Sequence, residues 1–211
     1  MAKETIAGVV LAGGLSRRMG GGDKGLAALG AATMLDHVVQ RIAPQVGRLA
    51  LNANGDKARF DALGLDVVAD TVEGFVGPLA GVLAGMRWAQ REMPHASHLV
   101  SVSSDAPFLP TDLVSRLASA LAAGGGRVAM ARSGGELHPV IGLWPVELAD
   151  DLEAALRAGL RKVLAWTDRH GTVAVDFAML AAGGETVDPF FNANTPDELD
   201  EARRLLALLP A

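Results

Sequence analysis

The sequence contains no cysteine and no tyrosine, and only 4% of its residues are aromatic. Without cysteine the chain has no disulfide bonds and no metal site built on thiolates. No apolar run is long enough to span a membrane, and the chain begins without the pattern of a signal peptide. These absences predict a cytoplasmic protein that does not contact a membrane.

Several motifs of common protein classes are missing as well. The five histidines lack a metal-binding spacing such as H-E-x-x-H, and no P-loop Gly-Lys-Ser/Thr follows a glycine at the required distance. The nucleophile motif G-x-S-x-G is absent. The net charge of −5, from 24 acidic and 19 basic residues, disfavours binding to the phosphate backbone of nucleic acid. We therefore expect neither a Ser/His/Asp hydrolase nor a nucleic-acid-binding protein.

What the chain does contain is a regular alternation of strand-like and helix-like segments. A length of 211 residues, half of them hydrophobic, suits one α/β domain with a substantial core. The alternation predicts a doubly wound, mostly parallel sheet with helices on both faces, a Rossmann-like α/β fold over residues 1–211. The expected strands cover residues 6–11, 48–52, 66–69, 98–102, 127–131 and 139–144. The expected helices cover residues 33–44, 110–122, 146–158 and 161–166, with others beginning at Pro78 and after Thr195.

The segment from Val10 to Lys24, VLAGGLSRRMGGGDK, carries the strongest functional signal. A buried strand ends there in a loop that holds five glycines, two arginines and a lysine. Glycines let backbone N–H groups approach a ligand closely, and the cationic side chains suit phosphate oxygens. The loop therefore predicts a triphosphate cradle that includes Gly13 and Gly14, with Arg18 and Lys24 holding the phosphates. A flexible surface loop is the alternative.

Asp105 stands just after the buried strand at 98–102. A carboxylate at a strand end lies where ligands bind in such a sheet, and Mg²⁺ is usually held by one or two carboxylates beside substrate phosphates. Asp105 is therefore the expected Mg²⁺ ligand, with an Asx turn before Pro107 as the alternative. Asn192 and Asn194 would face the same side of an extended segment. Asn194 is thus a second candidate ligand, unless it merely flanks a helix cap.

Polar side chains also end the second and third expected strands. Asn52 ends one of them, and Asp70 ends the other. A carboxylate can accept hydrogen bonds from N1–H and N2–H₂ of guanine, which adenine does not offer. Asp70, beside Asn52, is therefore a candidate for recognition of the base. Ordinary turn chemistry, as in the dipeptide Asn54-Gly55, is the alternative.

Two further groups of residues are weaker candidates. Gly77 and Pro78 open a helix whose N-terminus can favour an anion, and Gly81 would allow close approach of its backbone. A tight joint in which Gly81 packs on a strand is the alternative. His138 stands before an expected strand, where a side chain can face a substrate.

Together these parts suit nucleotidyl transfer to a phosphate acceptor. A phosphate monoester has a second pKa near ~6, so it is nucleophilic at neutral pH without a histidine base. Catalysis would then rest on positioning and on charge neutralisation at the α-phosphorus and the leaving pyrophosphate. The expected catalytic residues are Arg18, Lys24 and Asp105.

Four motifs resemble those of the molybdenum cofactor guanylyltransferases, a family of the nucleotidyltransferase superfamily, over nearly the whole chain. They run from Leu11 to Gly25, Gly77 to Gly81, Asp105 to Pro110 and Phe191 to Pro196. The resemblance implies transfer of GMP from GTP to the phosphate of molybdenum-molybdopterin with Mg²⁺, which forms the molybdopterin guanine dinucleotide cofactor and pyrophosphate. It also implies contacts with molybdopterin-loading proteins and acceptor molybdoenzymes. The implied nucleotide contacts are Leu11, Ala12, Gly13, Lys24, Asn52, Asp70 and Asp105.

The sequence departs from the family pattern beside Asp105. Ser103 and Ser104 replace the more usual Pro-Cys, and Ala106 replaces threonine; losing the threonine hydroxyl could loosen the loop that aims Asp105. Three alternatives stay open: a cytidylyltransferase acting on the same cofactor, a sugar- or alditol-phosphate nucleotidyltransferase, and a non-catalytic nucleotide-binding chaperone of the cofactor. The largest aromatic side chains are expected in the core and not under a pterin: Trp88, Trp144 and Trp166.

Overall fold

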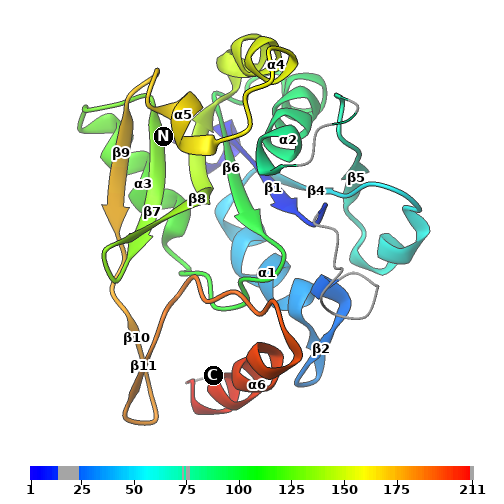
Figure 1. Ribbon diagram of the computed structural model, residues 1–211, viewed down its shortest axis with the longest axis vertical. Coiled ribbons are helices and arrows are strands. Elements are labelled where there is room, and N and C mark those ends of the chain that lie inside the picture. Colours follow the sequence, from blue (N-terminus) through cyan, green and yellow to red (C-terminus); the bar gives the residue numbers. More distant parts are fainter. Residues whose placement is uncertain (14–23, 73, 75–76, 210–211) are drawn as a thin grey trace.

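A seven-stranded sheet forms the centre of the computed structural model, which describes residues 1–13, 24–72, 74 and 77–209 (Figure 1). β1 pairs in parallel with β4 and β6, as β4 does with β5 and β7 with β9. The sheet is therefore mostly parallel, as the sequence predicted. Its strands are, in spatial order, β5 (Asp66–Val68), β4 (Arg48–Asn52), β1 (Ile6–Leu11), β6 (His98–Ser103), β8 (Glu136–Pro145), β7 (Val128–Ser133) and β9 (Thr172–Asp176).

β8 is the exception, because it runs antiparallel to both β6 and β7. A two-residue turn joins β7 to β8. Its residues, Gly134 and Gly135, have φ of 55° and 87°, and tight hairpin turns of this kind need positive φ at both positions. The sequence predicted two successive strands here, and their antiparallel pairing departs from the parallel arrangement expected for most of the sheet. As a consequence, the carboxyl ends of β6 and β7 and the amino end of β8 lie at the same edge of the sheet.

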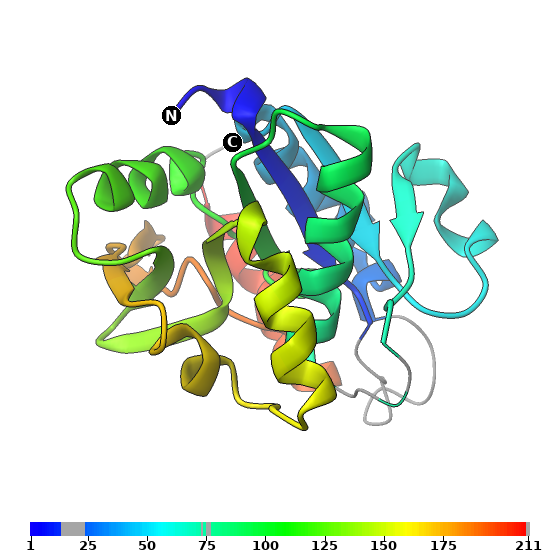
Figure 2. The ribbon, with the colours of Figure 1, turned by 90° about the horizontal axis from the view of Figure 1, so that it is seen from above.

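Helices cover both faces of the sheet, which confirms the doubly wound class (Figures 1 and 2). Alternate residues of a strand point to opposite faces, so Val10 of β1 packs in the cluster with α1 and α3, whereas Val9 packs in the cluster with α2 and α4. The three tryptophans are buried in the second cluster, as predicted. The helices on the sheet are α1 (Met34–Ile42), α2 (Pro78–Glu92), α3 (Leu113–Ala122), α4 (Ala149–Arg157) and α5 (Val163–Thr167).

A third cluster of buried side chains lies at the carboxyl edge of the sheet, where α6 (Pro196–Leu208) packs (Figure 1). Two short hairpins contribute to it: β2 (Ala28–Leu29) with β3 (Ala32–Thr33), and β10 (Leu180–Ala182) with β11 (Glu185–Val187). These hairpins and β9 were not predicted. The four hairpin strands have only two or three residues each, which carry little periodicity.

Helix boundaries follow local hydrogen bonding. Thr33, at the start of the helix expected over 33–44, and Thr195 both form capping boxes, with Asp36 and Glu198 respectively. The helix expected over 110–122 begins only at Leu113, and the one expected over 146–158 divides into a short 3₁₀ turn and α4. Within the described residues, no helix is long and apolar enough to cross a membrane.

Candidate active site

The carboxyl ends of β1, β4 and β6 meet at one level of the sheet. Leu11, the last residue of β1, is in register with Asn52 of β4 and Ser103 of β6. The chain beyond β1 stays tied to both neighbours. The amide of Ala12 donates to the carbonyl of Asn52 at 2.8 Å, and the amide of Ser104 donates to the carbonyl of Leu11 at 3.1 Å. Leu11, Ala12 and Gly13 are therefore held between the end of β4, which carries Asn52, and the end of β6, which leads to Asp105.

Asp70 is fixed by two asparagines. Nδ2 of Asn52 donates to one carboxylate oxygen at 3.0 Å, and Nδ2 of Asn54 donates to the other at 2.8 Å. Oδ1 of Asn54 in turn accepts the amide N–H of Asp70 at 3.0 Å. Asn52 is only 3% exposed, whereas Asp70 is half-buried. The three side chains form one rigid acceptor group next to β1. The sequence had placed Asn54 at the end of the second strand, with a turn as the alternative, and had not assigned it to Asp70.

The start of α2 packs tightly against this group. A Cβ on Gly81 would lie 2.3 Å from Oδ1 of Asn52 and 2.8 Å from Cδ2 of Leu11. Gly81 therefore packs on the ends of β4 and β1, which was the alternative interpretation of this glycine. Gly77 is the N-cap residue of α2 and makes no side-chain cap, and Pro78 occupies the first turn. The helix start is thus placed beside Asn52, as a ligand-binding N-terminus would require.

Lys24 lies beside the segment that precedes α6. Its Nζ donates to Oδ1 of Asn194 at 2.8 Å. Asn194 is held in turn by Glu198 of α6, whose carboxylate accepts a hydrogen bond from the backbone N–H of Asn194 at 2.7 Å. The neighbouring amide of Ala193 donates to the carbonyl of Asp105 at 3.1 Å. The tertiary structure thus brings together Lys24, Asn194 and the loop of Asp105, which come from three distant segments of the chain.

The carboxylate of Asp105 is oriented by Ser103, whose hydroxyl donates to Oδ1. The loosening expected from the missing threonine hydroxyl is therefore offset by a donor two residues earlier. Ala106, at the threonine position, is fully buried, so its methyl group packs where a hydroxyl would need a partner. Ser103 was treated only as a departure from the family pattern, although its position at the end of a strand could have indicated contact with Asp105.

The donor set fits a divalent cation that keeps several non-protein ligands. Among the described residues there is no group of three or more His, Cys, Asp or Glu side chains able to hold a metal ion. Asp105 is half-buried, with its carboxylate at the carboxyl edge of the sheet. Mg²⁺ typically takes one or two carboxylates and completes its shell with phosphate oxygens and water. Asp105 therefore fits a metal bound together with a nucleotide.

The remaining expected contacts lie outside the described residues. Gly14 and Arg18 fall within residues 14–23, so the cradle is described only at its two ends, Gly13 and Lys24.

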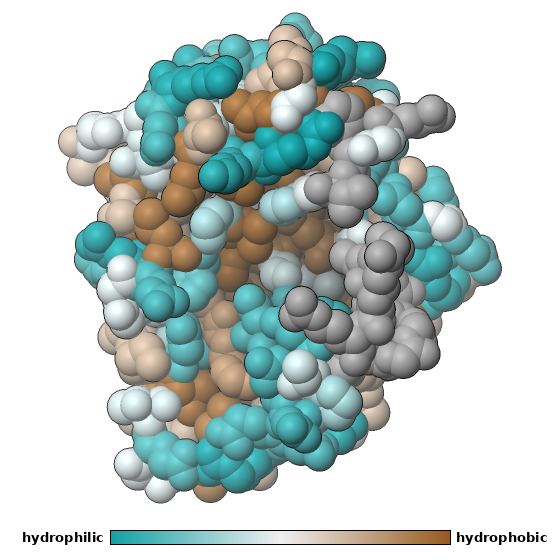
Figure 3. Space-filling view, in the orientation of Figure 1, coloured by the Kyte–Doolittle hydropathy of each residue, from teal (hydrophilic) through white to brown (hydrophobic). Residues whose placement is uncertain are grey.

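Between the sheet and α6 the surface is hollowed, and hydrophobic side chains line the bottom of this recess (Figure 3). Its polar rim suits a ligand with both charged and apolar parts.

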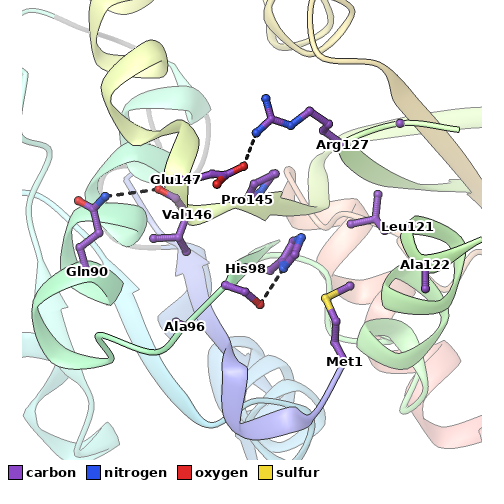
Figure 4. A pocket seen from close by; sticks show the side chains of 12 residues that line it. Met1, Gln90, Ala96, His98, Leu121, Ala122, Arg127, Pro145, Val146 and Glu147 are labelled. Carbon is purple, nitrogen blue, oxygen red and sulfur yellow. Dashed lines mark hydrogen bonds and ion pairs between the residues drawn. The ribbon is translucent and has the colours of Figure 1, made fainter. Parts of the chain in front are cut away.

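A second depression, of about 650 Å³, lies at the opposite edge of the sheet (Figure 4). It includes His98, the first residue of β6, and an ion pair between Arg127 and Glu147. Burial lowers the pKa of His98, so this imidazole is neutral at pH 7. Because Asp105 follows the other end of β6, this depression is separate from the polar strand ends.

Comparison with known proteins agrees with this geometry. Residues 8–173 match the family described as the MobA-like NTP transferase domain. A molybdenum cofactor guanylyltransferase from Bradyrhizobium sp. (strain ORS 278) is 52% identical over 204 residues, which cover 96% of this chain and 94% of the relative.

Two solved structures share the fold. Molybdopterin-guanine dinucleotide biosynthesis protein A from Archaeoglobus fulgidus has a TM-score of 0.72 at 23% identity, over 96% of this chain and all of that one. A Mycobacterium tuberculosis protein in complex with manganese has a TM-score of 0.65 at 20% identity, over 95% of this chain and 98% of that one. The family match over residues 8–173 and the relative that is 52% identical over nearly the whole chain agree with the polar strand ends described above. This chain therefore belongs to the MobA-like NTP transferases and is a nucleotidyltransferase.

Proposed function

We propose that the protein transfers GMP from GTP to the phosphate of molybdenum-molybdopterin, which yields the molybdopterin guanine dinucleotide cofactor and pyrophosphate. The observation that carries this proposal is the convergence of Lys24, Asp70 and Asp105 at one edge of the sheet. The name of the Bradyrhizobium relative, at 52% identity over nearly the whole chain, supports the same reaction. A cytoplasmic location, and contacts with molybdopterin-loading proteins and acceptor molybdoenzymes, remain predictions from the sequence.

The Asp70 group supports recognition of guanine. An ionised carboxylate has about four acceptor positions, and Asn52 and Asn54 each occupy one. The remaining positions can accept N1–H and N2–H₂ of guanine. Because two amides already fix the carboxylate, it pays little conformational entropy when it binds the base. Adenine and cytosine lack this pair of adjacent donors.

The phosphates of GTP would lie between the glycine loop and Lys24. We assign Leu11, Ala12, Gly13, Gly14 and Gly77 to backbone contacts with the nucleotide, and Arg18 and Lys24 to charge neutralisation. Lys24 can move between Asn194 and a phosphate because its ammonium group is carried on a flexible four-carbon chain. A divalent metal fits at Asp105, and we assign it as Mg²⁺, with Oδ1 of Asn194 as a second ligand.

The chemistry needs no side-chain base. An oxygen of the acceptor phosphate attacks the α-phosphorus of GTP, the bond from that phosphorus to the bridging oxygen breaks, and pyrophosphate leaves. When bound, the metal supplies charge neutralisation at the phosphates. Asp105 would hold the metal, and the hydrogen bond from Ser103 orients its carboxylate. Lys24 and Arg18 stabilise the charge that develops on the leaving pyrophosphate.

Calorimetric titration with GTP, CTP and ATP in Mg²⁺ tests the base assignment. We expect the wild type to prefer GTP and Asp70→Ala to weaken GTP binding by at least tenfold, because hydrogen bonds to a charged group contribute about 1.5–3 kcal/mol. Asp56→Ala is the matched control, since Asp56 is an exposed aspartate of the β4–β5 connection whose carboxylate accepts only the local amide of Ala58 among the hydrogen bonds of the described residues. A preference for CTP would favour a cytidylyltransferase, and absence of nucleotide binding would overturn the proposal.

Turnover separates the enzyme from a non-catalytic chaperone. Asp105→Ala should retain the fold and lose most of the GMP transfer, because we assign its carboxylate to the metal at the phosphates. Wild-type rates of pyrophosphate release in this variant would show that Asp105 has no catalytic role.

A further inference from the structure

Ser133, His138 and Asp188 form a hydrogen-bonded chain away from the nucleotide contacts. Oγ of Ser133 lies 2.7 Å from Nε2 of His138 and 2.7 Å from Oδ1 of Asp188. Ser133 is only 2% exposed, whereas His138 and Asp188 are half-buried. The three residues come from the end of β7, the start of β8 and the segment after β11.

The direction of the hydrogen bonds follows from the chemistry of the three groups. A carboxylate accepts only, so the single hydroxyl proton of Ser133 points to Asp188. Ser133 can then bond His138 only by accepting, which places the imidazole proton on Nε2. Burial lowers the pKa of His138 despite the opposing effects of Asp188 and Glu136, so the ring is neutral at pH 7. Nδ1 of His138 therefore carries a lone pair.

This lone pair is available to a ligand. Among the described residues, the one buried side-chain nitrogen or oxygen without a hydrogen bond is Oγ1 of Thr172. Nδ1 of His138 has no hydrogen bond to the described residues, so it is accessible to solvent. The ring itself is immobilised against Phe190, at 4.7 Å between centroids. A fixed, neutral acceptor is thus exposed on the protein surface.

Its position connects it to the catalytic residues. The carboxyl ends of β6 and β7 and the amino end of β8 share one edge of the sheet, so His138 lies on the same edge as Asp105. The segment from Asp188 to Asn194 crosses this edge (Figure 1) and ends at the partner of Lys24. Asp188 is five positions before Ala193, whose amide donates to the Asp105 carbonyl. Asp188 therefore lies within about 18 Å of Ala193, a distance that a substrate can span.

The two halves of the edge differ in chemistry. The half formed by β1, β4 and β5 carries Asn52 and Asp70, which the proposed function uses for GTP. The half formed by β6, β8 and β7 carries Asp105 and the His138 chain. Because the acceptor must reach the α-phosphorus opposite the leaving pyrophosphate, it needs space beyond the nucleotide half.

We propose that His138 lies in the acceptor subsite and accepts, through Nδ1, a hydrogen bond from a ring N–H or amino group of the acceptor's heterocycle, while Ser133 and Asp188 position its ring. This inference rests on the proposed function, because it assigns that reaction's second substrate. A lone pair on a neutral imidazole repels phosphate oxygens, so His138 recognises the heterocyclic part, and the phosphate is left to Lys24 and to the metal that Asp105 would hold.

The test uses three substitutions of the same residue, assayed with GTP and with molybdenum-molybdopterin as the acceptor. His138→Phe removes both ring nitrogens, and His138→Gln places its amide nearer the position of Nε2. His138→Asn places an amide oxygen near the position of Nδ1. We expect the KM for the acceptor to rise about tenfold in His138→Phe and His138→Gln, the loss of one hydrogen bond, with partial recovery in His138→Asn. The affinity for GTP, measured by calorimetry, should stay unchanged in all three.

Ser133→Ala tests the positioning role. Nitrogen NMR of the wild type should show the Nε2–H tautomer of His138, and Ser133→Ala should shift it towards a mixture and raise the acceptor KM. An acceptor KM within twofold of wild type in folded His138→Phe and His138→Gln overturns the proposal, as does equal weakening of GTP binding. If one variant does not fold, the other two and the tautomer decide. Failure of the wild type to bind GTP overturns the proposed function instead, and the acceptor subsite with it.

Discussion

At the scale of single residues, the orientation of Asp105 depends on a hydroxyl two positions earlier. Ser103 stands where the family pattern has proline, which has neither a hydroxyl nor an amide proton. In this chain the Ser103 hydroxyl donates to Oδ1 of Asp105, while the buried Ala106 gives up the hydroxyl expected there. In this chain the donor that orients Asp105 thus comes from two positions before it.

We predict that Ser103→Ala raises the Mg²⁺ concentration needed for half-maximal activity by about tenfold, because a hydrogen bond to a charged group contributes about 1.5–3 kcal/mol. Ser104→Ala is the matched control, since this neighbouring serine makes no hydrogen bond to the Asp105 carboxylate within the described residues. Activity measured over a series of Mg²⁺ concentrations distinguishes the two variants. The same Mg²⁺ dependence of activity in Ser103→Ala and in the wild type would contradict the prediction.

At the scale of elements, the start of α2 is fitted to the ends of β1 and β4. Gly81 lets the helix approach Asn52, and Gly85, one turn later, lets it approach β1, where a Cβ would lie 2.9 Å from Cγ1 of Val9. Both glycines serve packing, but only the first contacts a residue of the Asp70 group.

We predict that Gly81→Ala and Gly85→Ala both lower the free energy of unfolding by about 1–3 kcal/mol, because each overpacks a helix–sheet contact. Only Gly81→Ala should also weaken GTP binding, by about tenfold, since Asn52 must move and carry Asp70 with it. Denaturant titration and calorimetry measure the two effects. Equal GTP affinity in the two folded variants would show that Asn52 does not position Asp70.

At the scale of the whole molecule, one sheet joins two separate core clusters. Trp88, Trp144 and Trp166 all belong to the cluster with α2 and α4, so tryptophan fluorescence reports mainly on that face. The other face, with α1 and α3, carries no tryptophan, and far-ultraviolet circular dichroism reports on both.

We predict a single cooperative unfolding transition, because β1 and β6 contribute residues to both clusters. Fluorescence and circular dichroism should then give the same midpoint in a denaturant titration. Two distinct midpoints would mean that the two faces unfold independently and that residues 1–211 are not one domain.

Much of the architecture could be predicted because it is local. β1 and β4 lie where short apolar runs in the sequence placed them, and α2 begins at the expected Pro78. Capping boxes form at Thr33 and Thr195, where an acidic residue follows three positions later. The candidate residues at strand ends were recognisable for the same reason, since a polar residue after a buried strand has a defined place in a parallel sheet.

The sequence by itself thus determined the class of fold, the order of the main helices and strands from β1 to α5, and the chemistry available at the strand ends. Only the tertiary structure decided how those groups combine. The reversal of β8 brings His138 to the edge that carries Asp105, and α6 brings Asn194 to Lys24 across 170 positions of the chain. Such contacts join segments that have no local periodicity in common, so they depend on packing between elements and not on the pattern within any one of them.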